Sequence, residues 1–133
     1  MSEEKRIKVV LLEPGKLARA AEIDASLEGM QKIVEGMIEG FYPFEEEVCI
    51  VCNDEGKINR MPLNRAVYGE DKEMIDIIAG TAFICDCQGE SFGSLSDEQI
   101  ARYKKQFRYP EIFLRAGDKI EAFPINPDRD KER

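Results

Sequence analysis

Four cysteines are spaced in a way that is found among zinc ligands. Cys49 and Cys52 form a C-x-x-C pair, and Cys85 and Cys87 form a C-x-C pair, which together could supply four thiolates to zinc. However, isoleucine and valine stand between the first two cysteines, where a zinc knuckle needs a turn, and in a strand these two side chains point to opposite faces. We interpret the thiols as reduced, with several of them buried, and a zinc set and a redox pair or disulfide are the alternatives. No metal or cofactor is expected.

The residues that usually carry catalysis are missing or unpatterned. The chain has no histidine, the commonest general base and the usual partner of serine and cysteine nucleophiles. The loop "GESFG" at 89–93 lacks the lysine of a P-loop and the glycine spacing of a dinucleotide fold. The acids Asp71, Glu73 and Asp76 do not follow a calcium-loop pattern. We therefore predict that the protein is not an enzyme.

An asparagine and an arginine stand side by side in "PLNRAVYG", residues 62–69. Arginine offers five donors in a planar fork that suits carboxylate or phosphate, and asparagine can cap a turn. A structural interpretation is that Asn64 caps the following turn while Arg65 pairs with a nearby acid. Its candidate partners are Glu55, Glu70 and Asp76.

A functional interpretation of the same stretch is also open. Asn64, Arg65 and Tyr68 are candidate ligand-binding residues for a small anionic or nucleotide-like molecule. A concave pocket containing Arg65 without a carboxylate partner would favour this interpretation. An Arg65 held by Glu70 or Asp76 would remove the reason for it.

The charge of the chain is unevenly distributed. The 133 residues carry a formal net charge of -8, and residues 41–98 hold thirteen acidic against four basic side chains. An anionic surface repels phosphate backbones, so we expect no direct binding of nucleic acid, whereas docking to a basic protein partner is open. No apolar run approaches the ~20 residues of a membrane span, and residues 1–12 lack the pattern of a secretory signal. We expect a cytoplasmic protein that does not enter a membrane.

Apolar periodicity predicts the elements of the first half. Alternating residues in "RIKVVLLEP", closed by Pro14-Gly15, and the stretch "ARAAEID" indicate an opening hairpin. A helix is predicted at about 25–38, with Asp24 as N-cap and Gly40 at the left-handed position after its end. Gly29 and Gly36 on this helix suggest close approach to the sheet. A hairpin with strands at about 47–53 and 57–61 is expected around Asp54-Glu55-Gly56.

The second half shows similar signals. Gly80 suggests a bend before a buried central strand at about 81–87. Ser96 and Gln99 form a capping box that begins a second helix, and two short strands are expected about Gly117-Asp118. Strands joined by tight turns pair antiparallel. The predicted class is α+β, with residues 1–125 as a single domain, a mixed or mainly antiparallel sheet and two main helices packed on it. Residues 126–133 are expected to be a disordered charged tail.

Several motifs resemble a known family of unknown function. They are the start of the first helix at 27–31, the turn at 53–57, "PLNR" at 62–65, the segment 78–80 and "LSDEQ" at 95–99. The chain from about residue 6 to 108 resembles the bacterial and phage family catalogued as domain of unknown function number 3846. The resemblance implies a small protein often encoded on phages, plasmids and conjugative elements, and it implies no activity. The segment "FYPFEEE" and the chain after about residue 110 look like additions to the pattern.

These observations favour one function and leave two alternatives open. The favoured one is an acidic accessory protein of a mobile element that acts by binding another protein through its acidic face, not by catalysis. The first alternative is a protein that binds a small molecule or nucleotide signal around Asn64, Arg65 and Tyr68. The second is an acidic DNA mimic, which would require carboxylates spaced like phosphates along one face. The oligomeric state and the partner are left open.

Overall fold

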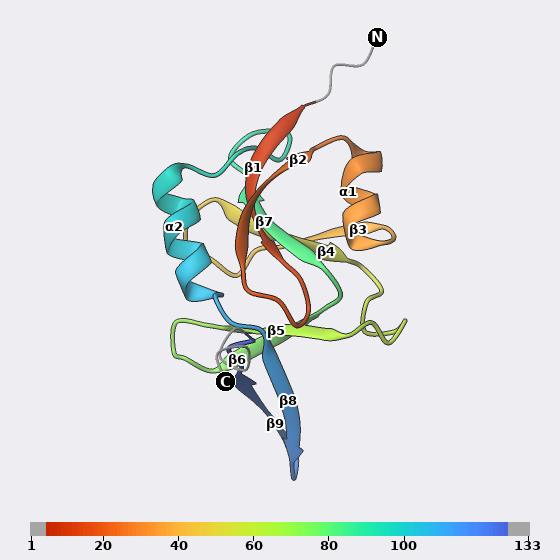
Figure 1. The fold of residues 1–133 in the computed structure, drawn as a ribbon, viewed down its shortest axis with the longest axis vertical. Coiled ribbons are helices and arrows are strands. Elements are labelled where there is room, and N and C mark those ends of the chain that lie inside the picture. Colours follow the sequence, from red (N-terminus) through yellow and green to blue (C-terminus); the bar gives the residue numbers. More distant parts are fainter. Residues whose placement is uncertain (1–4, 128–133) are drawn as a thin grey trace.

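A five-stranded antiparallel sheet forms the centre of the computed structural model, which describes residues 5–127 (Figure 1). The strand order is β2-β1-β7-β4-β3, so the first hairpin lies beside strands that come much later in the chain. The five strands are β1 (Arg6–Leu12), β2 (Arg19–Asp24), β3 (Ile38–Phe41), β4 (Val48–Asn53) and β7 (Ala82–Asp86).

Two helices and two further hairpins complete the fold (Figure 1). The helices are α1 (Leu27–Val34) and α2 (Asp97–Gln106), and the hairpins are β5 (Leu63–Tyr68) with β6 (Met74–Ala79) and β8 (Glu111–Ala116) with β9 (Lys119–Pro124). Every strand pair recorded between these elements is antiparallel. The predicted α+β class is confirmed, but the strands form three sheets where one was expected.

Both faces of the central sheet are buried, and this explains its nearly continuous apolar strands. Ile7, Val9 and Leu11 of β1 belong to a core cluster that includes residues of α1, whereas Val10 and Leu12 belong to the opposite cluster, which includes residues of α2 and of the β5–β6 hairpin. Alternate side chains of a strand point to opposite faces, so this one strand contributes to both cores. The helices lie on opposite sides of the sheet (Figure 1).

The opening hairpin, the buried strand near 81–87, the second helix and the late hairpin are confirmed. The side chain of Ser96 accepts from the backbone N–H of Gln99, and the Gln99 side chain accepts from the backbone N–H of Ser96. Gly80 has φ +81° and makes the bend between β6 and β7. Residues 128–133, most of the predicted disordered tail, lie outside the described residues. Neither helix in the described chain is long and apolar enough to cross a membrane.

The first helix is shorter than predicted at both ends. Its N-cap is Ser26, so the prediction of Asp24 as N-cap is wrong. The Asp24 carboxylate instead accepts from the backbone N–H of Ser26. It ends at Glu35 in the left-handed conformation (φ 61°), so the prediction that the helix reaches residue 38, with Gly40 after its end, is wrong. The cause lies in β4, because Asn53 Nδ2 donates to the carbonyls of Val34 and Glu35 at 3.0 and 3.3 Å and satisfies the end of the helix.

The expected strand at 57–61 does not exist. Residues 54–60 form a turn, and the neighbours of β4 in the sheet are β3 and β7. The close approach that we inferred for Gly36 is present, since a Cβ there would lie 2.6 Å from Asn53 Nδ2. A Cβ on Gly29 would likewise lie 2.6 Å from the Asp24 carbonyl oxygen.

The segment between β3 and β4 is anchored to α2 by one carboxylate. Glu46 accepts from Arg102 Nη1 at 2.5 Å, from the Tyr103 hydroxyl, and from Gln99 Nε2 at 3.2 Å. The hydrogen bond from Arg102, followed by that from Tyr103, lowers the pKa of Glu46 from its ordinary 4.5 to about 2. The ionised carboxylate therefore stabilises the folded state.

Replacing Glu46 with glutamine tests this anchor. Since the folded pKa is depressed, the stabilisation is fully present above pH 4.5 and is lost as the pH falls through about 2. The side chain is one-third exposed, so solvent screening reduces the effect, and we expect E46Q to lower the free energy of unfolding by about 1–2 kcal/mol at pH 7. The difference from the wild type, measured by urea unfolding, should shrink between about pH 5 and pH 2. The exposed neighbour E47Q is the matched control and should change little.

Candidate functional site

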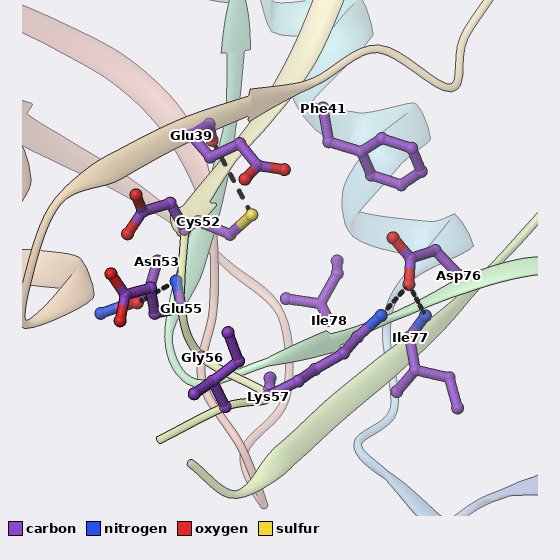
Figure 2. A pocket seen from close by; sticks show the side chains of 13 residues that line it. Glu39, Phe41, Cys52, Asn53, Glu55, Gly56, Lys57, Asp76, Ile77 and Ile78 are labelled. Atoms are coloured by element: carbon purple, nitrogen blue, oxygen red, sulfur yellow. Dashed lines mark hydrogen bonds and ion pairs between the residues drawn. The ribbon is translucent and has the colours of Figure 1, made fainter. Parts of the chain in front are cut away.

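A cavity of about 250 Å³ lies between β3, the end of β4, the following turn and β6 (Figure 2). Its apolar surface includes Phe41, Ile77 and Ile78, and its polar side chains come from three separate stretches of the chain. Four carboxylates and one ammonium line it: Glu39, Asp54, Glu55, Asp76 and Lys57. We call this the acidic cavity.

The turn at 54–60 is held together by local hydrogen bonds and lies close against β6. Asn53 Oδ1 accepts from the Glu55 backbone N–H at 2.8 Å, and the Asn59 N–H donates to the Glu55 carbonyl at 2.8 Å. A Cβ on Gly56 would lie 2.7 Å from the Ala79 carbonyl oxygen, closer than real Cβ atoms approach a backbone oxygen. Glycine at this position therefore permits the turn to close one side of the cavity.

The charge balance of the acidic cavity is strongly negative. Lys57 extends along one wall and binds Asp76, which also accepts from the Ile77 N–H at 2.7 Å (Figure 2). Within residues 5–127, none of the other three carboxylates has a recorded ion-pair partner. The cavity thus already holds one ammonium group and retains negative charge that could attract another cation.

Cys52 points into the acidic cavity, but it is not activated as a nucleophile. Its Sγ donates to the Glu39 carbonyl at 3.7 Å (Figure 2). Burial, with the charges of Glu39 and Asp76, raises the pKa of this thiol to about 11. A reactive cysteine needs a thiolate, which positive surroundings favour and this environment does not.

The four sulfur atoms are divided between the two cores. Cys49 and Cys85 are opposite each other in β4 and β7, with their Sγ atoms 3.8 Å apart, and Cys87 packs against the same cluster. Cys52 packs against the other cluster. The described residues contain no group of three or more acidic, cysteine or histidine side chains placed to hold a metal, and all four cysteines are free thiols. Burial also raises the pKa of Cys87 to about 11.

Asn64 is fully buried and joins two strand ends. Its Nδ2 donates to the carbonyls of Leu12 and Gly80, at 2.9 and 2.8 Å. It therefore connects the end of β1 to the bend between β6 and β7. Both N–H groups of the side-chain amide are engaged in these bonds, so Asn64 has a structural role.

Arg65 is 1% exposed, and each of its five N–H groups has an acceptor. Nε donates to the Phe107 carbonyl at 2.7 Å, and Nη1 donates to the Glu13 carbonyl at 3.2 Å and to Asn64 Oδ1 at 2.6 Å. Nη2 donates to the carbonyls of Lys16 and Arg108, at 2.6 and 3.4 Å. One guanidinium thus joins β5 to the connection between β1 and β2 and to the end of α2.

The expected ion pair of Arg65 is wrong. The acceptors are carbonyl and amide oxygens, and none of Glu55, Glu70 and Asp76 contacts the guanidinium. Burial lowers the pKa of Arg65 to about 10, against the opposing effect of Glu111, so the group is charged at neutral pH. Residues near the helix C-terminus supply two of the carbonyls, and the dipole there favours a cation.

The predicted ligand site is only partly assembled. Arg65 and Tyr68 line a hollow of about 290 Å³ together with Lys105 and Arg108, and Asn64 does not line it. Arg65 has no carboxylate at ion-pair distance among residues 5–127, which meets the condition we set for ligand binding. Its donors are nevertheless all engaged, so it can attract an anion by its charge but can donate to one only by giving up an internal bond.

The sequence did not indicate the acidic cavity. Glu39 and Asp76 are far from the turn in the sequence, and no single motif joins them to Cys52 and Lys57. The available signals are the acid-rich middle segment and the turn at 53–57. The pairing of β3 with β4 places Glu39 opposite Cys52, and Asp76 comes from β6, which lies outside that sheet.

Replacing Arg65 with lysine separates a structural role from a ligand-binding role. Lysine keeps the charge but cannot reach five acceptors, so buried carbonyls lose their donors. We expect R65K to lower the free energy of unfolding by about 3–5 kcal/mol in the absence of any ligand. The matched control is R115K on the exposed β8 strand, which should change it by less than about 0.5 kcal/mol. Equal stability of the two variants would contradict the structural role.

Comparison with known proteins identifies a family but no activity. No curated protein and no solved structure matches the chain. The sequence model of the family described as "Domain of unknown function (DUF3846)" matches residues 7–108, which include both helices, the acidic cavity and Arg65. The β8–β9 hairpin lies beyond the matched region. The chain belongs to the DUF3846 family.

Proposed function

We propose that this protein is a binding protein that captures a lysine or arginine side chain of a partner protein in the acidic cavity. The observation that carries the proposal is the lining of the cavity, in which four carboxylates face one ammonium. A cation entering there gains attraction from the three carboxylates that have no recorded ion pair within residues 5–127.

The shape and lining of the cavity suit a cation on an apolar stem. Long basic side chains bury their methylene groups against apolar surface and keep the charged head near polar groups. Phe41 and Ile78 offer that surface, and Glu39 and Glu55 lie toward the opposite side (Figure 2). Lys57 already illustrates this mode of binding, since its stem runs along the wall and its ammonium meets Asp76.

Binding has more support here than catalysis. The thiol of Cys52 has a raised pKa, whereas a nucleophilic thiol needs a lowered one. The amine of Lys57 is engaged in an ion pair with Asp76 and is not free to attack a substrate. The sequence also has no histidine to act as a general base.

The biological setting that we propose rests on the family. We infer an accessory protein of a mobile element that works in the cytoplasm and contacts a basic partner surface. A DNA mimic has less support, because the clustered carboxylates surround a hollow that contains a lysine, whereas a mimic needs carboxylates in phosphate-like rows. A nucleotide-like ligand at Asn64, Arg65 and Tyr68 also has less support, because the donors of the first two are used internally.

Amide chemical shifts of the protein, titrated with a short peptide that carries a central arginine, test this function. The same peptide with citrulline in place of arginine has nearly the same shape and no charge. We expect the arginine peptide to shift residues 39, 52, 55 and 76, and E39Q/E55Q to weaken its binding by about 3- to 10-fold at low salt.

The matched control is E90Q/E121Q, which removes the same charge from exposed positions outside the cavity. It should weaken binding by less than about twofold, through long-range attraction alone. Equal binding of the citrulline peptide, or equal losses in the two double variants, would refute capture of a cation in the acidic cavity.

A further inference from the structure

A second hollow, of opposite charge, lies between α2 and the connection from β1 to β2. It has a volume of about 460 Å³ and is lined by Leu17, Ala18, Ala101, Lys104, Lys105 and Arg108. Three of these residues are cationic and three are apolar, and its lining includes no acidic residue. We call it the basic groove.

The α2 side of the basic groove is a regular stripe. Ala101, Lys104, Lys105 and Arg108 are spaced i, i+3, i+4 and i+7, so they lie on one face as the chain runs through α2 to just past its end. At 1.5 Å per residue this stripe is about 10 Å long. That length suits several residues of a bound chain better than a single small ion.

The lysines of the basic groove have no ion pairs in the described part of the chain. Arg108 lies over the ring of Tyr109, 5.2 Å from its centre, and within residues 5–127 it also has no ion pair. Arg102 on the same helix does pair, with Glu46. In a chain with eight more acidic than basic residues, these three cations are thus left free to meet an anion.

The walls of the basic groove are fixed in position by Arg65. Its Nη2 donates to the Lys16 and Arg108 carbonyls, and the Ala18 N–H donates to the Arg108 carbonyl at 2.9 Å. These bonds join the β1–β2 connection to the end of α2. The buried guanidinium has no ion-pair partner within residues 5–127 and also adds positive charge near the groove. The groove is therefore preorganised, which lowers the cost of binding.

We propose that the basic groove docks an acidic, amphipathic peptide segment of a partner protein. Carboxylates of that segment meet Lys104, Lys105 and Arg108, while an apolar side chain covers Leu17, Ala18 and Ala101. A nucleic-acid backbone fits less well, because its phosphates offer nothing to the apolar floor and the negative net charge of the protein repels them. This site is separate from the acidic cavity, so the protein can hold a basic and an acidic segment together.

The test is a titration of the full chain with a short peptide in which leucine alternates with pairs of glutamate, using a glutamine counterpart as reference. We expect the glutamate peptide to shift the amides of residues 17, 101, 104 and 105. K104Q/K105Q should weaken its binding by about tenfold at low salt. A101Q, which fills the floor without changing charge, should weaken it as well. Thermal unfolding of each variant shows whether the fold is kept.

The matched control is K8Q/K119Q, which removes two exposed lysines outside the groove and should weaken binding by less than about twofold. E39Q/E55Q should bind the peptide at least as tightly as the wild type, which separates this proposal from the acidic cavity. Equal losses in the two lysine variants would overturn it. Binding of the glutamine peptide as tight as that of the glutamate peptide would do so too. A single-stranded oligonucleotide that binds more tightly at the same residues would replace the acidic peptide as occupant.

Discussion

A buried guanidinium surrounded by carbonyl groups determines how three parts of this chain meet. Transferring a cation from water to the interior is costly unless its donors are satisfied, and all five donors of Arg65 have acceptors. Four of these are backbone carbonyls, from the β1–β2 connection and from the end of α2. Where α2 stops and how the first hairpin meets it therefore follow largely from one side chain of β5.

The two charged hollows follow from different features of the fold. Arg65 joins the walls of the basic groove through the Lys16 and Arg108 carbonyls and contributes its own charge nearby. The acidic cavity depends on the close approach of Gly56 to Ala79 and on β3 pairing beyond β4. Opposite charges on one small protein need not cancel, because the Debye length at physiological salt is only about 8 Å. Each hollow can therefore attract its own type of segment.

Elements set by local interactions were predictable from the sequence, and those set by distant side chains were not. The capping box of Ser96 and Gln99 and the alternation in β1 are local patterns, and both are present in the structure. The first helix was predicted too long because its end is satisfied by a distant side chain, Asn53 of β4, which donates to the carbonyls of Val34 and Glu35. Nothing in the helical sequence itself encodes that bond. The prediction of a strand at 57–61 was wrong for a similar reason, because the distant strand β7 pairs with β4.

The residues that the sequence marks as candidates for catalysis or ligand binding have mainly structural roles. The cysteines fill both cores, and Asn64 and Arg65 donate to the backbone. These side chains are distinctive because burial of a polar group demands a specific set of partners. Exposed carboxylates and lysines around a hollow do not require specific hydrogen-bond partners, so no motif in the sequence marks them. The carboxylates of the acidic cavity come together only in the folded chain, whereas the basic stripe of α2 follows from helical spacing. The two hollows, and not the distinctive residues, therefore carry the functional argument.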